Sequence, residues 1–202
     1  MKPRIAVIVL AAATLFGCAS SLMKPATTQS LSATPAQSSR VIFLRPSSFG
    51  GAIQASLFDV SGGAAKFIGV SSTGTKVVYD VAPGTHRFMV VSEAADFMEA
   101  SLAPGKTYYG IVTARMGAWK ARFSLWPVKA DAKSEFSSQS KDFAQWAAKG
   151  KIVENTPEGQ KWFDANRGSI QSKHDEYLVV WKQRPAAEIA ERTLNESDGL
   201  DK

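Results

Sequence analysis

The chain has 202 residues, one cysteine and a formal net charge of +6. A single cysteine excludes a disulfide within the chain, so the fold must be held together by its own core. The positive excess is spread along the chain without a long block of like charges, which argues against a nucleic-acid-binding protein and is compatible with weak attraction to anionic lipid or glycan surfaces.

The N-terminus has the layout of a secretory signal. Lys2 and Arg4 make a short cationic start, and the residues from Ile5 to Phe16 are apolar or small apart from one threonine. A run of this length suits the apolar region of a signal peptide and is shorter than the roughly 20 residues that a transmembrane helix needs. We therefore predict a signal peptide over residues 1–17.

The predicted leader runs into the sequence Leu15–Cys18 (LFGC). This sequence resembles the lipobox of bacterial lipoproteins, in which the cysteine receives a diacylglycerol and the leader is removed just before it. The resemblance implies that acyl chains on Cys18 hold the mature chain on a membrane, because each buried methylene contributes about 0.8 kcal/mol. Ala19 and Ser20 follow and no aspartate does, which by the same resemblance implies an outer-membrane protein that faces the periplasm; the inner membrane and the cell surface stay open. The alternative is that Cys18 is an incidental apolar residue of an ordinary signal peptide or anchor helix.

Residues 18–39 are rich in Ser, Thr, Ala, Gln and Pro and contain few large apolar side chains. Such a composition cannot bury enough surface to offset the cost of ordering the chain. We predict a flexible tether that stretches to about 70 Å and lets the following domain stand away from the membrane.

From Arg40 onward, short β-rich segments alternate with Gly, Ser and Pro turn signals. They are Val41–Leu44, Ala52–Val60, Lys66–Val70, Lys76–Val81, Thr85–Ser92, Asp96–Leu102, Thr107–Met116 and Ala118–Val128. This spacing predicts a mainly β domain over residues 40–129, an antiparallel β-sandwich of about seven or eight strands. No helical pattern of about ten residues interrupts the segments, which argues against a parallel α/β sheet.

Two Ala-Pro-Gly turns, at residues 82–84 and 103–105, join predicted strands. Proline presets φ for the second position of a tight turn and glycine accepts the positive φ of the third, so we predict type II turns. Together with Leu44–Pro46 (LRP) and the tyrosine pair at 108–109, these turns resemble the PEGA-type and related β domains of bacterial lipoproteins. The resemblance implies a β-sandwich over about residues 40–128 and implies no particular activity.

The last part of the chain, residues 130–202, has helical spacing, and we predict a C-terminal α-helical subdomain. Ser140 is the predicted N-cap of a short helix that ends at Lys149, with Gly150 in the left-handed conformation after it. Thr156, followed by a proline, predicts the start of a long helix.

The long helix has one apolar stripe, formed by Trp162, Phe163, Ile170, Tyr177 and Trp181. The stripe either packs on the β domain or forms a groove for a partner helix or a membrane surface. Acidic residues dilute the basic ones on the rest of the helix, which favours packing. Pro185 ends or kinks the helix, and residues 186–194 predict a last short one.

The sequence offers few groups for catalysis. A serine nucleophile needs a base, and His86 and His174 are the two histidines. His86 lies beside a turn at the start of an apolar strand, and the acids that follow His174 point in different directions around a helix, so neither predicts a catalytic or metal site. Asp96 and Glu99 face opposite sides of a strand, which does not suit a glycosidase pair. We predict no catalytic residue, no metal and no cofactor.

One surface is a candidate for binding. The predicted strand that begins at Trp119 places Lys120, Arg122 and Trp126 on one side. Cations beside an aromatic ring can bind a glycan or an anionic headgroup. The alternative is that this side lies under the C-terminal helices.

These observations favour a lipid-anchored, non-enzymatic envelope protein, a binding or scaffold subunit of an envelope complex with a protein or peptidoglycan partner. Two alternatives stay open. One is an envelope hydrolase or glycan-processing enzyme that uses His86 or His174 with acids from separated strands. The other is a glycan- or lipid-headgroup-binding module that uses Lys120, Arg122 and Trp126.

Overall fold

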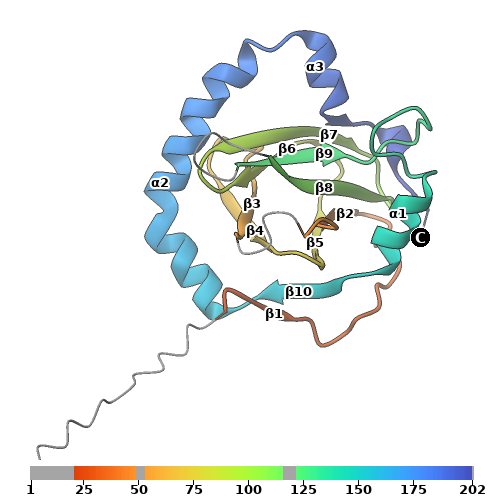
Figure 1. Cartoon of the computed structure of the whole chain (residues 1–202), viewed down its shortest axis with the longest axis horizontal. Helices are drawn as coiled ribbons and strands as arrows, with labels where there is room; N and C mark the ends of the chain where they lie inside the picture. Colours follow the sequence, from red (N-terminus) through yellow and green to blue (C-terminus); the bar gives the residue numbers. More distant parts are fainter. Residues whose placement is uncertain (1–20, 49–52, 116–121, 202) are drawn as a thin grey trace, which may run out of the picture.

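The computed structural model describes residues 21–48, 53–115 and 122–201, and two β-sheets lie at its centre (Figure 1). We call them sheet A, with the strand order β1-β10-β5-β2-β8-β9, and sheet B, with the order β11-β7-β6-β3-β4. The strands are β1 (Met23–Pro25), β2 (Ser39–Leu44), β3 (Ala55–Asp59), β4 (Lys66–Ser71), β5 (Thr75–Val81), β6 (Gly84–Val91), β7 (Ala95–Leu102), β8 (Thr107–Arg115), β9 (Arg122–Pro127), β10 (Lys151–Asn155) and β11 (Thr193–Leu194). The helices are α1 (Lys141–Ala148), α2 (Pro157–Lys182), α3 (Ala186–Glu191) and the 3-10 turn η1 (Glu196–Asp198).

The faces of the two sheets that point toward each other share one apolar core. Successive residues of a strand point to opposite faces, and in β2 Val41 and Phe43 point into this core while Ile42 points outward. Sheet B contributes Leu57 and Phe88 to the same core. The ring centroids of Phe43 and Phe88 lie 5.4 Å apart, so the two sheets are in direct contact.

Helices cover the outer faces of both sheets. α2 lies along sheet B (Figure 1) and buries Phe163, Ile170 and Trp181 against it. α1 covers sheet A, where the ring centroids of Phe143 and Tyr109 lie 4.9 Å apart. The predicted packing of the apolar stripe on the β domain is confirmed. No helix within the described ranges is long and apolar enough to span a membrane.

The prediction of a mainly β fold is confirmed, but its detail is wrong in two respects. The described residues form eleven strands rather than seven or eight, because β1, β10 and β11 come from outside residues 40–129. The sheets are mixed rather than antiparallel, since β2 pairs with β8, β10 with β5 and β11 with β7 in parallel. β2 and β8 can run parallel because the chain between them passes through other strands and no tight turn joins the pair. The last predicted helix, 186–194, is shorter than expected because Thr193–Leu194 is β11.

The capping residues lie where the sequence predicts them. Ser140 Oγ accepts a hydrogen bond from the backbone N–H of Phe143 (3.0 Å), and Thr156 Oγ1 accepts one from that of Gly159 (3.1 Å). Gly150 has a φ of 90°, and the glycines of both Ala-Pro-Gly turns also have positive φ. Local turn and cap chemistry therefore decides where these elements begin and end.

The segment predicted as a flexible tether is bound to the β domain from Ser21 onward, which corrects that prediction. β1 pairs antiparallel with β10 at the edge of sheet A. The backbone N–H of Thr156 donates to Leu22 O (3.2 Å), and its Oγ1 donates to Ser21 O (2.8 Å). Further along, the hydroxyl oxygens of Thr34 and Thr107 lie 2.6 Å apart. These contacts use backbone groups and small polar side chains, so a segment with few apolar residues is held without a core of its own.

Candidate functional site

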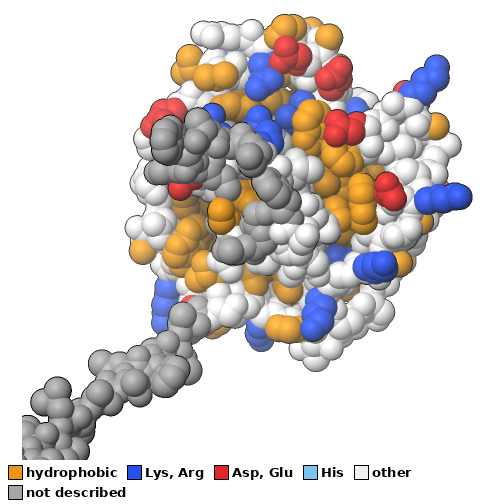
Figure 2. Space-filling model, in the orientation of Figure 1, with side chains coloured by type: hydrophobic (Ala, Val, Ile, Leu, Met, Phe, Trp, Pro, Cys, Tyr) orange, Lys and Arg blue, Asp and Glu red, His pale blue; other side chains and the backbone are white. Residues whose placement is uncertain are grey.

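The structure describes the predicted lipid attachment site and the predicted binding surface only in part. Cys18 and Lys120 lie outside the described residues, and Arg122 is exposed at the start of β9. Trp126 is half-buried, with the guanidinium carbon of Arg192 4.1 Å from its ring centroid. One face of this ring is therefore occupied by the C-terminal segment. On the face of the molecule in Figure 2, basic side chains are scattered among acidic and uncharged ones.

His86 lies in a polar cluster where β3 and β6 meet. Its Nδ1 is 3.5 Å from Asp59 Oδ2 and 3.2 Å from Ser61 Oγ, and Ser61 Oγ also donates to Asp59 Oδ1. Its Nε2 hydrogen bonds to the backbone oxygen of Ala82 (2.9 Å). In a catalytic triad the two ring nitrogens contact the nucleophile and the acid separately. Here both groups contact one nitrogen, so the cluster connects strands and does not activate the serine.

The contacts of this cluster shift two pKa values in opposite directions. The hydrogen bond to Asp59 raises the pKa of His86 above its ordinary value, against the opposing effect of burial. Burial by itself would raise the pKa of Asp59, but hydrogen bonds from His86, Ser61 and Tyr79 outweigh it and hold that pKa well below its usual range. The charged pair is therefore favoured at pH values between the ordinary pKa values of Asp and His.

Asp59→Asn is expected to cost most stability between about pH 4 and 6.5. The contribution of His86 is complete below its unfolded-state pKa and is lost as the pH rises through its raised folded-state pKa. The contribution of Asp59 is complete above its unfolded-state pKa and is lost as the pH falls through its lowered folded-state pKa. Urea denaturation should show a loss in unfolding free energy of about 1–3 kcal/mol at about pH 5.5 and a smaller loss at about pH 9.

The control for this pH dependence is the His86→Gln background. There, Asp59→Asn should cost the same unfolding free energy at both pH values, because the group that titrates between them is absent. An equal loss of unfolding free energy at both pH values for Asp59→Asn in the wild-type background would contradict an ion pair between Asp59 and His86.

His174 is buried in the interface between α2 and sheet B. Its ring centroid lies 5.4 Å from that of Phe97, and its Nδ1 is 2.8 Å from Asp175 Oδ1. Among the described residues its Nε2 has no hydrogen-bond partner, and no three His, Cys, Asp or Glu side chains lie close enough together to hold a metal ion. The acid beside His174 is Asp175 of the same helix. The hydrolase alternative needs a histidine beside acids from separated strands, and His174 does not have that arrangement.

A second polar cluster is centred on Asp96 of β7, which is fully buried. Asp96 accepts hydrogen bonds from Tyr177 Oη of α2 (2.7 Å) and from the backbone N–H of Leu125 in β9 (3.1 Å). Arg192, directly after α3, pairs with the same carboxylate and donates to Leu125 O (3.0 Å). The cluster therefore ties α2, the end of α3 and β9 to β7. Sequence reasoning missed Arg192; its signal was Asp96, an acid between the apolar residues Ala95 and Phe97 of β7.

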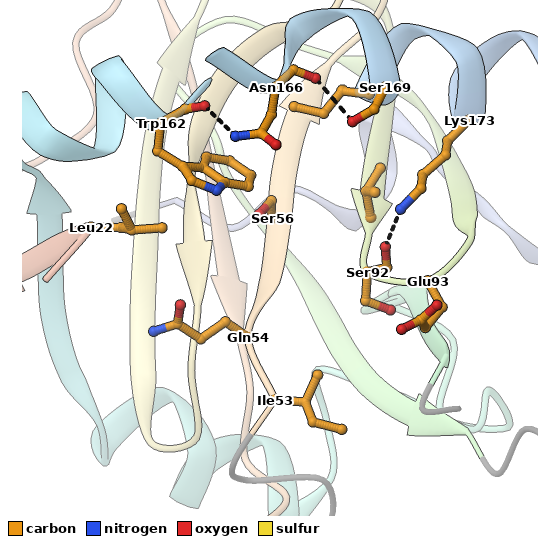
Figure 3. Close-up of a pocket in the computed structure, with 12 residues that line it drawn as sticks. Leu22, Ile53, Gln54, Ser56, Ser92, Glu93, Trp162, Asn166, Ser169 and Lys173 are labelled. Atoms are coloured by element: carbon orange, nitrogen blue, oxygen red, sulfur yellow. Dashed lines mark hydrogen bonds between the residues drawn. The ribbon is translucent and has the colours of Figure 1, made fainter. Parts of the chain in front are cut away.

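An open cavity of about 520 Å³ lies between α2 and sheet B (Figure 3). Ser56 of β3 and Val91 of β6 line it from the sheet, and Leu22 lines it beside the docked N-terminal segment. The lining residues from α2 are Trp162, Asn166, Ser169, Ile170 and Lys173. Its volume lies in the range of small-molecule sites, and its lining combines an aromatic ring with several polar groups.

The first half of α2 carries polar side chains where it faces this cavity. Trp162, Asn166, Ser169 and Lys173 follow one another at helical spacings of three and four residues, so they share one face. Asn166 Nδ2 donates to Trp162 O (2.7 Å), and Lys173 Nζ donates to Ser92 O (2.6 Å). The helix is thus apolar where it touches the sheet and polar where the cavity separates the two, and sequence reasoning did not use this polar spacing.

Comparison with protein-family models, with curated proteins and with solved structures finds no match to this chain.

Proposed function

We propose that this chain is a non-enzymatic, lipid-anchored protein of the bacterial envelope whose β domain binds or scaffolds a partner close to the membrane surface. The anchor in this proposal is Cys18, on the strength of the LFGC sequence at residues 15–18. The observation that carries the close approach to the membrane is the docking of Ser21–Pro25 on the β domain.

The docked segment leaves little chain between the proposed anchor and the domain. Only Ala19 and Ser20 separate Cys18 from Ser21, whose carbonyl is held by Thr156. Three residue steps span about 10 Å at most, instead of the roughly 70 Å of a free tether. An acylated Cys18 would therefore hold the start of α2 and the nearby cavity next to the lipid surface.

The proposed anchor is tested by labelling with an alkyne fatty acid in a bacterial host. We expect label on the wild-type chain and none on Cys18→Ser, which should also keep its leader. Equal labelling of both chains would overturn the anchor. The binding role is tested by crosslinking in intact envelopes followed by affinity purification, and the lack of any reproducible partner would count against it.

The docking itself is tested by two glycines of α2. A Cβ at Gly159 would lie 2.5 Å from Leu22 O, whereas one at Gly168 would meet nothing within 4 Å. Alanine stabilises a helix interior by about 0.5–1 kcal/mol relative to glycine. We expect Gly168→Ala to raise the melting temperature, and Gly159→Ala to lower it and to speed proteolytic cleavage at residues 21–25. Equal stabilisation by both substitutions would contradict the tight contact.

A further inference from the structure

We infer that the cavity between α2 and sheet B is a carbohydrate-binding site that takes neutral pyranose rings, from a free glycan or from a glycolipid headgroup. The inference rests on the proposed function for its place beside the membrane and deepens it by naming a class of ligand.

The sheet side of the cavity holds a serine hydroxyl without a protein partner among the described residues. Ser56 is 7% exposed, and its Oγ makes no hydrogen bond with any described residue. On the same face of β3, Phe58 packs under α2, and Val91 lies opposite Ser56 in the register of β6. The Ser56 hydroxyl is accessible from the cavity, so it can hydrogen-bond to whatever occupies that space. Ser56 is therefore suited to a hydroxyl group of a ligand, or to water until the ligand arrives.

Further polar groups surround the same hollow. Trp162 is half-buried with its ring centroid 5.9 Å from that of Phe67, and within the described part of the chain its Nε1–H has no acceptor. Figure 3 shows Trp162, Ser56 and Gln54 around one space. The Gln54 side chain is exposed and makes no hydrogen bond among the described residues, while Asn166 uses its amide nitrogen on Trp162 O and leaves its oxygen available.

The charges at the cavity balance. Among the described residues that line it, Lys173 is the one cation and Glu93 the one anion. The Lys173 ammonium already donates to Ser92 O (2.6 Å). A site for phosphate or carboxylate gathers a surplus of cationic donors. The cavity therefore suits a neutral ligand.

A pyranose ring matches this arrangement of groups. Its face of C–H groups can lie on the Trp162 indole, and its hydroxyls can exchange hydrogen bonds with Ser56, Gln54 and Asn166. An acyl chain would displace water from those side chains and offer them no hydrogen-bond partner, which costs free energy. The mixture of one aromatic ring with hydroxyl and amide groups thus favours a sugar over a lipid tail.

The test is isothermal titration calorimetry on the full-length chain in a detergent without a sugar headgroup. The soluble probes are chitotriose and maltotriose, the membrane probe is phosphatidylcholine vesicles with a galactolipid, and inorganic phosphate is the anionic comparison. We expect saturable binding of a neutral saccharide that Gln54→Ala and Trp162→Phe each weaken about tenfold. Gln160→Ala and Trp146→Phe are matched controls away from the cavity and should bind as the wild type does.

Binding of the soluble probes or of the galactolipid supports the inference and identifies the source of the sugar. The inference is overturned if no saccharide binds saturably at millimolar concentration, if Gln54→Ala and Trp162→Phe bind normally, or if these variants abolish phosphate binding. Fatty-acid labelling of the same preparation separates the two proposals, because sugar binding by an unlabelled wild-type chain would uphold the cavity and refute the anchor.

Discussion

Asp96→Asn is expected to lower the free energy of unfolding by about 3–5 kcal/mol, because it leaves the buried Arg192 guanidinium without its counter-charge. Asp96 is 0% exposed and Arg192 is 5% exposed, so water cannot solvate the charge that remains. The amide has nearly the size of the carboxylate, so the loss reports charge and not a cavity. Arg192 would keep its hydrogen bonds to Leu125 O (3.0 Å) and Phe97 O (3.2 Å), but neutral carbonyls do not balance a full charge. Urea denaturation followed by circular dichroism measures the difference.

The matched control is the exposed ion pair on α2. Asp164 and Arg167 lie 2.7 Å apart with side chains 52% and 57% exposed, so Asp164→Asn should cost less than about 1 kcal/mol. Asp96→Leu combined with Arg192→Met removes both buried charges and should cost less than the sum of the two single substitutions. A loss below about 1 kcal/mol for Asp96→Asn would show that this pair does not hold β7, β9 and the C-terminal segment together.

Strands and turns that depend only on residues close together in the sequence could be predicted from it. Each of the eight β segments predicted between residues 40 and 129 contains a strand within the described residues, since alternation and turn chemistry are local properties. β10 shows no alternation of buried and exposed residues and β11 has only 2 residues, and each pairs in parallel with a distant strand. The tether was mispredicted because composition measures only what side chains can bury, whereas β1 is held by backbone hydrogen bonds to β10.

The cavity could not be predicted in the same way, because its residues come from separate segments of the chain. Leu22, Gln54 and Ser56 meet α2 only after β1 and β3 have taken their places in different sheets. One signal was present in the sequence: Asn166 and Lys173 interrupt the face of α2 that otherwise packs on the sheet. Polar residues on a packed helix face therefore mark where the helix and the sheet separate.

Phe163→Ala is expected to destabilise the protein by about 3–5 kcal/mol, because it opens a cavity at the centre of the contact between α2 and sheet B. Phe163 is 3% exposed. Its ring centroid lies 5.5 Å from that of Phe67, with the rings 10° from parallel, and 5.8 Å from that of Phe58. Phe163→Leu fills most of the same space and should cost less than about 1.5 kcal/mol.

Val179→Ala is the matched control for Phe163→Ala on the same helix. Val179 is 60% exposed, so its truncation should change the unfolding free energy by less than about 0.5 kcal/mol. A double-mutant cycle of Phe163→Ala with Phe67→Ala should give a coupling energy of about 0.5–1.5 kcal/mol for the stacked pair. Because Phe163 adjoins Trp162, Phe163→Ala should also loosen the wall of the cavity and weaken saccharide binding, whereas Val179→Ala should not. If the costs of the two substitutions simply added, the stacked pair would have no coupling energy, and other contacts would hold α2 on the sheet. Contacts near Trp181 would then have to fix the wall of the cavity.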